Sequence, residues 1–290
     1  MALTPNQTYT LNGVKVCEKI IPDGTRWKDA TKAKNAGFKA GALYKNQGKL
    51  CGNGRPQWVT IHNTDDLKNV DDDAEQYTRA TYNENMGSVR VHFYVDDLGA
   101  WQNLKAGTGQ RNDPVGGAEV SWHSGDGVSP TGGNQTSLSI ECIMNDNSTH
   151  DARAKDNTAR LAAWLLWKNG LGIDKLVTHT YWVNKSAGKS FQDVDKQCTN
   201  LISGKKWCPT YIFASSNPSV ALKNWKSFKT IVKGYLDDLN GGKDTAPNTT
   251  EKVYYVVQAG SFAHRPNAEN MVRKLNSYGL PAIITTKPQN

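Results

Sequence analysis

The stretch Gln57-Trp58-Val59-Thr60-Ile61-His62 carries the clearest information about the fold. Its β-branched residues and alternating side chains are typical of a strand, which we predict over residues 57–62. A histidine stands at the carboxyl end of this strand, and a second, His179, ends the short strand predicted at 176–179. Sheet proteins tend to place their sites beyond the carboxyl ends of strands. We therefore expect a functional site near the carboxyl ends of these two strands.

Further strands and helices follow along the chain. Apolar and polar residues alternate over 88–96, which predicts a strand, and residues 136–144 are typical of a buried strand. Amphipathic patterns and capping residues predict three long helices. These helices are expected at residues 71–85, 149–169 and 218–239.

The two ends of the chain have a different character. Residues 4–53 are rich in Gly, Asn and Lys, which predicts an irregular wrap with one helix near 27–36. Residues 240–251 have the composition of a linker, and a strand, a helix and a strand are expected after it. The last three elements are predicted at 253–258, 267–278 and 280–285. The expected division is a domain at 1–240, a linker at 241–251 and a small β-α-β segment at 252–290.

The composition excludes several classes of protein. The 290 residues include 35 Lys+Arg and 27 Asp+Glu, a net charge of +8 that suits an anionic partner. The basic residues are scattered, which argues against a nucleic-acid partner. No apolar run approaches the ~18 residues that a membrane helix needs, so we expect no membrane insertion. The first residues lack the features of a secretory signal, and five dispersed cysteines do not form a disulfide framework, so we expect synthesis in the cytoplasm.

A metal-binding group is suggested by His62, His179 and Cys208, the last within Lys206-Trp207-Cys208-Pro209. Two histidines and a cysteine with one open position are a ligand set of catalytic zinc. The three residues lie far apart, so their spacing alone has little specificity. Structural histidines and an inert buried cysteine are the ordinary alternative.

Several short motifs occur in the order in which one known family has them. They are Val59–Thr64, Val91–Asp97, Trp101–Asn103, Trp122–Gly127, Ser139–Glu141, Thr178–His179 and Lys206–Pro209. Over about residues 58–212 the chain resembles the zinc-dependent N-acetylmuramoyl-L-alanine amidases of type 2, shared by phage endolysins and peptidoglycan recognition proteins. The resemblance implies an α/β fold with a central mixed β-sheet flanked by helices. It also implies that zinc-activated water cleaves the amide between N-acetylmuramic acid and L-alanine of peptidoglycan.

The same resemblance implies roles for single residues. The ligands of one Zn²⁺ would be His62, His179 and Cys208. Glu141 matches the acidic general base, and Lys206 matches a basic residue near the developing oxyanion. His123 and Asn134 resemble residues of the substrate groove.

The chain departs from the family pattern in two ways. Val91 stands where some members have a tyrosine. A tyrosine-assisted mechanism is therefore not expected, and the catalytic roles are assigned to Glu141 and Lys206. The interval between the second and third ligands is unusually long, which leaves Cys198 as an alternative third ligand. We prefer Cys208 because it alone has the Lys-x-Cys-Pro context. The roles of the insertions at 105–120 and 186–205 stay open.

The carboxyl-terminal segment has a resemblance of its own. Residues 254–262 and 267–270, together with Leu275, resemble the first half of a SPOR domain, a family that binds glycan. We therefore expect a partial wall-binding segment there.

Two alternatives to a zinc amidase remain open at this stage. One is a non-catalytic peptidoglycan-binding protein on the same scaffold, although recognition-only members commonly lack the cysteine ligand. The other is a cysteine peptidase with Cys208 as nucleophile and His179 as base. We expect an endolysin or autolysin that acts on the cell wall, binds peptidoglycan and is drawn to teichoic acid by its charge. Phage or bacterial origin is left undecided.

Overall fold

The computed structural model describes residues 2–45, 49–64, 73–125, 131–145, 147–200, 207–241 and 265–277. The chain divides into two units, Met1–Asp244 and Thr245–Asn290. Within the described residues of the second unit, helix α9 covers Arg265–Ser277. The linker beyond Gly241 and the strands predicted at 253–258 and 280–285 lie outside the described residues. In the described ranges, no helix combines the length and apolar character needed to cross a membrane.

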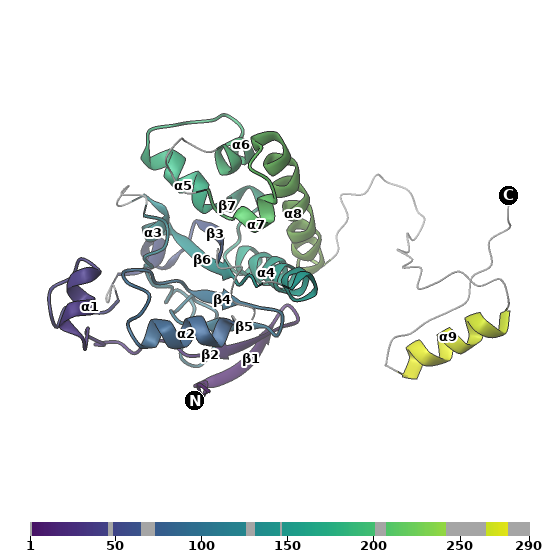
Figure 1. The fold of residues 1–290 in the computed structure, drawn as a ribbon, viewed down its shortest axis with the longest axis horizontal. Helices are drawn as coiled ribbons and strands as arrows, with labels where there is room; N and C mark the ends of the chain where they lie inside the picture. Colours follow the sequence, from purple (N-terminus) through teal and green to yellow (C-terminus); the bar gives the residue numbers. More distant parts are fainter. Residues whose placement is uncertain are drawn as a thin grey trace. The chain divides into compact units, whose positions relative to one another are not determined.

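A mixed sheet of seven strands forms the centre of the first unit, with the order β1-β2-β5-β4-β6-β3-β7 (Figure 1). The strands are β1 (Gln7–Leu11), β2 (Val14–Glu18), β3 (Trp58–Asn63), β4 (Phe93–Val95), β5 (Ala100–Gln102), β6 (Ser137–Cys142) and β7 (Leu176–Thr178). The pairs β1–β2 and β4–β5 are antiparallel, whereas β2–β5, β4–β6, β6–β3 and β3–β7 are parallel. The expected α/β fold with a central mixed sheet is confirmed.

Helices cover both faces of this sheet. Their bounds are α1 (Ala30–Asn35), α2 (Ala74–Tyr82), α3 (Gly133–Thr136), α4 (Ser148–Lys168), α5 (His179–Ser186), α6 (Val194–Thr199), α7 (Thr210–Phe213) and α8 (Pro218–Leu239), with 3₁₀ turns at Cys51–Gly54 and Ile173–Lys175. The two longest, α4 and α8, pack side by side (Figure 1). The side chain of Asn217 accepts hydrogen bonds from the first-turn amides of α8 and so caps this helix.

The alternation of strand side chains separates the core from the site. Val59 and Ile61 of β3 belong to the main apolar core together with Leu161 of α4 and Trp225 of α8. Successive side chains of a strand point to opposite faces, so His62 faces away from this core. Helix α2 packs on β4 and β5 and covers part of the sheet face opposite the main core.

The amino-terminal region contains a hairpin that the sequence reading did not predict. Strands β1 and β2 pair in antiparallel register, with Asn12 and Gly13 at the turn. Both turn residues have positive φ, at 47° and 81°, which is the conformation that a tight hairpin turn requires. The predicted irregular wrap is therefore wrong for residues 7–18. The helix predicted near 27–36 is present but shorter, as α1.

The strand predicted at 88–96 is also shorter than expected. Only Phe93–Val95 pairs in the sheet, as β4. The backbone N–H of Arg90 donates instead to the carbonyl of Trp122, at 2.7 Å. Val89 is 40% exposed, and Val91 belongs to a different apolar cluster from Phe93. An alternating pattern therefore continued beyond the segment that pairs with neighbouring strands.

Candidate functional site

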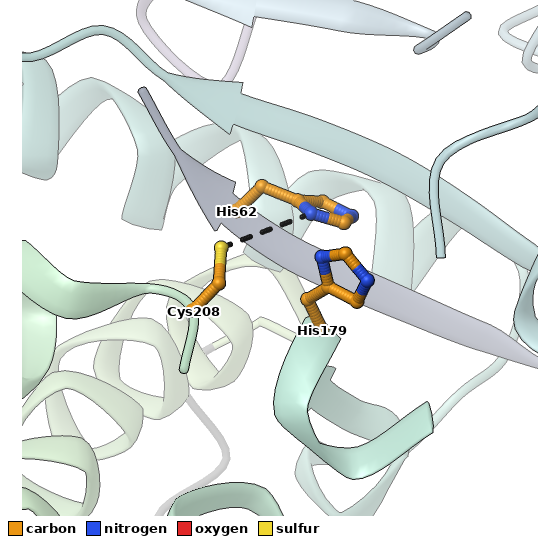
Figure 2. Close-up of side chains that lie close together, drawn as sticks. All are labelled: His62, His179 and Cys208. Atoms are coloured by element: carbon orange, nitrogen blue, oxygen red, sulfur yellow. Dashed lines mark hydrogen bonds between the residues drawn. The ribbon is translucent and has the colours of Figure 1, made fainter. Parts of the chain in front are cut away.

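Three side chains from distant parts of the sequence meet at the carboxyl edge of the sheet (Figure 2). His62 lies near the end of β3, His179 begins α5 directly after β7, and Cys208 precedes α7. One ligand atom of each lies within 4.8 Å of the others. Strands β3 and β7 are parallel neighbours, so their carboxyl ends meet at one edge. This topology brings together residues that the sequence keeps far apart.

Cys208 is held in place by the first turn of α5. Its backbone N–H donates to Oγ1 of Thr180 at 2.9 Å, and its carbonyl accepts from the same hydroxyl at 3.1 Å. The backbone N–H of Thr180 also donates to this carbonyl, at 3.2 Å. Thr180 therefore ties Cys208 to the helix that carries His179. Sequence reasoning missed Thr180, because its only signal is its position directly after a ligand histidine.

The position of Cys208 shows which ring nitrogen of His62 faces the other candidate ligands. Sγ of Cys208 lies 3.9 Å from Nδ1 of His62. The opposite ring nitrogen, Nε2, lies 2.8 Å from Nδ1 of His123. In His179, Nε2 lies 2.9 Å from the carbonyl oxygen of Ser124. The loop at His123–Ser124 thus contacts both ligand histidines.

The two residues predicted for the substrate groove lie in this loop and beside it. His123 is 7% exposed, and its Nε2 lies 3.2 Å from the carbonyl oxygen of Gly133. Oδ1 of Asn134 accepts from the backbone N–H groups of His123 and Ser124, at 2.9 and 2.8 Å, and from the Ser124 hydroxyl at 2.9 Å. These polar atoms contact the protein itself. A direct contact of His123 or Asn134 with substrate stays a prediction.

Glu141 stands beside the group on the adjacent strand. It is paired in register with His62, and its Oε2 lies 3.9 Å from Nδ1 of that histidine. Its side chain is 16% exposed. On the other side, Tyr94 is in register with Glu141, but it is buried and its hydroxyl is hydrogen-bonded to Thr81. The carboxylate is therefore next to the candidate metal ligands, whereas the Tyr94 hydroxyl is engaged with α2.

Two of the sequence predictions concern the segment before Cys208. Cys198, the alternative third ligand, is buried on α6 and is not part of the group of three ligand atoms. Burial raises the pKa of its thiol to about 12, so it stays protonated near neutral pH. Lys206 lies outside the described residues, and its predicted role near the oxyanion is not tested by the structure.

Burial keeps the neighbouring histidines uncharged. Desolvation, and then the nearby His92 and His179, hold the pKa of His123 well below its ordinary value. Desolvation likewise lowers the pKa of His92 to about 4. Neutral imidazoles can act as hydrogen-bond donors and acceptors at once, and they do not repel a cation.

The chemistry of the donor set fits zinc. Two imidazole nitrogens and a thiolate sulfur are ligands that zinc prefers, whereas Mg²⁺ and Ca²⁺ are bound by oxygen. Three protein ligands leave one position open, as in catalytic zinc sites. The adjacent carboxylate of Glu141 would stand close to that position.

Comparisons with known proteins identify the family of the chain. The sequence model described as N-acetylmuramoyl-L-alanine amidase matches residues 52–210, and that of the SPOR domain matches 251–290. The N-acetylmuramoyl-L-alanine amidase XlyA of Bacillus subtilis (strain 168) is 29% identical over 138 residues, which are 48% of this chain and 41% of that protein. The chain therefore spans less than half the length of this curated relative.

Solved structures give further similarities. The catalytic domain of XlyA is 24% identical, with a TM-score of 0.48 over 75% of this chain and 98% of that chain. The Staphylococcus aureus hydrolase AmiA in complex with its ligand is 18% identical, with a TM-score of 0.45 over 78% and 85% of the two chains.

The expected amidase family and the SPOR resemblance are both confirmed by the sequence models. The amidase match covers more than half of the chain and includes His62, His179, Cys208 and Glu141. On this evidence, the protein belongs to the N-acetylmuramoyl-L-alanine amidase family.

Proposed function

We propose that this protein is a peptidoglycan hydrolase that cleaves the amide between N-acetylmuramic acid and the L-alanine of the stem peptide. We further propose that one zinc ion is held by His62, His179 and Cys208. The observation that carries the proposal is the convergence of these three ligand atoms within 4.8 Å, with Glu141 beside them. Membership in the amidase family supports the same type of reaction.

Zinc bound by these residues would polarise the amide carbonyl and make a water molecule more acidic. The water oxygen would attack the carbonyl carbon, and the carboxylate of Glu141 would take up a proton from this water. The same carboxyl group would then deliver the proton to the amide nitrogen while the carbon–nitrogen bond breaks. The products are the lactyl carboxylate of the muramic acid and the free amino group of L-alanine.

The environment of Glu141 suits a group that exchanges protons. Its side chain is mostly buried beside His62 yet keeps some exposure, so water and substrate can reach it. We propose that Lys206 adds a positive charge near the developing oxyanion, as the resemblance to the amidase family implies.

The place of action follows from the substrate. We propose that the protein acts on the bacterial cell wall, with peptidoglycan as its partner. The SPOR match at 251–290 supports a second contact with glycan. The net charge of +8 suits an additional attraction to anionic wall polymers such as teichoic acid.

The test is digestion of purified peptidoglycan by the full chain, with mass spectrometry of the released fragments. We expect stem peptides that begin with a free L-alanine, together with glycan whose lactyl groups are carboxylates. A chelator should abolish their release and added zinc should restore it. Fragments that keep the muramyl–alanine bond would overturn the proposal in favour of a peptidase, and binding without cleavage would favour a recognition protein.

A carboxylate variant tests the role of Glu141. Glu141→Gln should lower kcat by about 10²–10⁴-fold, because the amide cannot take up the proton, while zinc content is retained. The matched control is Glu75→Gln on α2, whose partly buried carboxylate pairs with Arg79 and accepts from the backbone N–H of Leu3. The control should keep full activity. Full activity of Glu141→Gln would show that another group is the base.

A further inference from the structure

A chain of hydrogen bonds runs from the candidate metal ligand into the protein. Nε2 of His62 lies 2.8 Å from Nδ1 of His123, and Nε2 of His123 lies 3.2 Å from the carbonyl oxygen of Gly133. All three residues are buried. The carbonyl at the end of the chain can only accept a hydrogen bond.

This carbonyl determines which ring nitrogens carry hydrogen. Nε2 of His123 must donate to Gly133, so in neutral His123 the other nitrogen, Nδ1, is the acceptor. Nε2 of His62 must then be the N–H that donates to it. Neutral His62 therefore carries its lone pair on Nδ1, the nitrogen that faces Cys208.

The second histidine ligand is oriented by the next residue of the same loop. The carbonyl oxygen of Ser124 accepts from Nε2 of His179, at 2.9 Å. Neutral His179 therefore also has its lone pair on Nδ1. Two adjacent residues thus select the same tautomer in both ligand histidines.

The loop itself is fixed by Asn134. Its single carbonyl oxygen accepts three hydrogen bonds from His123 and Ser124. Gly133, whose carbonyl ends the chain, leaves no room for a side chain. A Cβ atom there would lie 2.7 Å from Oγ of Ser124 and from the ring of Trp182. The support behind the two ligands is therefore closely packed.

We propose that His123 is a positioning residue which, with the Ser124 carbonyl, presents Nδ1 of His62 and of His179 to the metal. This rests on the zinc site of the proposed function. His123 acts through His62 and needs no contact with substrate. Loss of such a partner behind a metal ligand typically weakens metal affinity by about 10–100-fold.

The first test measures the tautomers directly in the metal-free protein. Nitrogen-15 NMR of the histidine rings at pH 7.5 distinguishes Nδ1–H from Nε2–H imidazoles. We expect Nε2–H for His62, His123 and His179 in the unmodified protein. A predominant Nδ1–H form of His62 would overturn the proposal without any variant.

The second test measures zinc affinity by competition with a chromogenic chelator. His123→Leu removes the acceptor and should weaken zinc binding by about 10–100-fold. His123→Gln keeps an amide oxygen to accept from His62 and an amide N–H₂ to donate to Gly133, so it should restore affinity to within about threefold of the wild type. Equal affinity of the leucine variant and the wild type would refute the positioning role.

The matched control is another buried histidine, in the segment before β4. Both ring nitrogens of His92 are hydrogen-bonded, to Ser139 and to the carbonyl of Glu119. His92→Leu should lower the melting temperature of the metal-free protein and leave zinc affinity unchanged. A parallel loss of zinc affinity in this control would mean that His123 acts only through stability. If His123→Leu does not fold, the tautomers of the wild type and His123→Gln decide the question.

These measurements separate the inference from the proposed function. A protein that binds zinc through the expected tautomers but releases no stem peptide would contradict the amidase proposal alone. A wild-type protein that binds no zinc would contradict both.

Discussion

Two buried clusters of polar groups lie in the same unit but differ in where their atoms point. The first, the Asp113 cluster, is centred on a fully buried carboxylate that accepts from Gln102, from Thr108 and from the backbone N–H groups of residues 106–108. The second, the ligand cluster, consists of His62, His179 and Cys208, whose ligand atoms converge on one point. In the Asp113 cluster the hydrogen-bond donors point at a carboxylate of the protein, whereas in the ligand cluster the nitrogen and sulfur atoms converge on the proposed metal site.

The difference teaches how to distinguish a structural polar cluster from a functional one. Burial of polar groups is costly unless they find partners, and both clusters meet this requirement. Asp113 satisfies the backbone of the loop that contains it, so it explains how the insertion at 105–120 is held. In the ligand cluster the loop at His123–Ser124 contacts Nε2 of each histidine, and Nδ1 is the atom that we propose as the metal ligand.

The largest expected effect comes from removing the thiolate of the ligand cluster. Cys208→Ser should lower bound zinc from about one per chain to less than about a tenth, and wall lysis to background, because a hydroxyl is a poor zinc ligand. Atomic absorption after desalting measures the metal. Cys198→Ser is the matched control and should keep its zinc. Zinc loss in the control alone would identify Cys198 as the ligand.

Breaking the Asp113 cluster should affect stability and not metal binding. Asp113→Asn replaces an acceptor of several donors by an amide that is itself a donor, at a cost of about 2–4 kcal/mol in the free energy of unfolding. Urea denaturation of the metal-free protein measures this cost, and zinc titration should give an unchanged Kd. A weakened Kd would show that the two clusters are coupled.

Acid should destabilise the fold through the buried histidine His92. Burial lowers the pKa of His92 to about 4, whereas an unfolded histidine titrates near ~6.5. The charges or potential charges of Asp113 and His123 act on it, and Ser139 and the carbonyl of Glu119 provide its hydrogen bonds. Above the unfolded pKa both states are neutral, and as the pH falls toward 4 only the unfolded chain takes up the proton. The free energy of unfolding should therefore fall by up to about 3 kcal/mol over this window.

The comparison of the wild type with His92→Gln isolates this contribution. Glutamine keeps an acceptor and a donor but does not titrate, so unfolding of the variant should take up about one proton fewer near pH 5. Denaturation at several pH values measures the difference. Identical pH dependence of the two proteins would assign the acid sensitivity to other groups.

A smaller loss of stability is expected from adding a side chain at Gly133, beside the loop at His123–Ser124. Gly133→Ala places a methyl group against Trp182 and Ser124, which should cost about 1–3 kcal/mol in stability. Calorimetry of the metal-free protein measures the cost. Because the carbonyl of Gly133 ends the hydrogen-bond chain from His62, zinc affinity should fall slightly as well. A stable variant with tighter zinc binding would contradict the packing described here.

The sequence predicted those parts of the fold that have regular patterns. The long helices α4 and α8, with Asn217 as a cap, follow from local periodicity and local hydrogen bonding. The hairpin at residues 7–18 was missed although Asn12-Gly13 is a recognised turn signal. The strand at 88–96 was overextended because alternation does not show where pairing stops; the structure ends it where Arg90 bonds to Trp122.

The candidate site was predictable in part. Motif order indicated His62, His179, Cys208 and Glu141, and the sheet explains why they meet. The bonds of His123 and Asn134 could not be predicted, because they depend on the positions of a loop and a short helix. Thr180 was missed for the same reason, since its partner is 28 residues away in the chain.

The separation of the ligands along the sequence has a consequence for biosynthesis. His62 and Cys208 are 146 residues apart, and only a completed sheet with α5 docked brings them together. Contacts between such distant residues carry a large loop-closure cost and form late in folding. Under the proposed function, a nascent or misassembled polypeptide would therefore bind no zinc and cleave no peptidoglycan until the fold is complete.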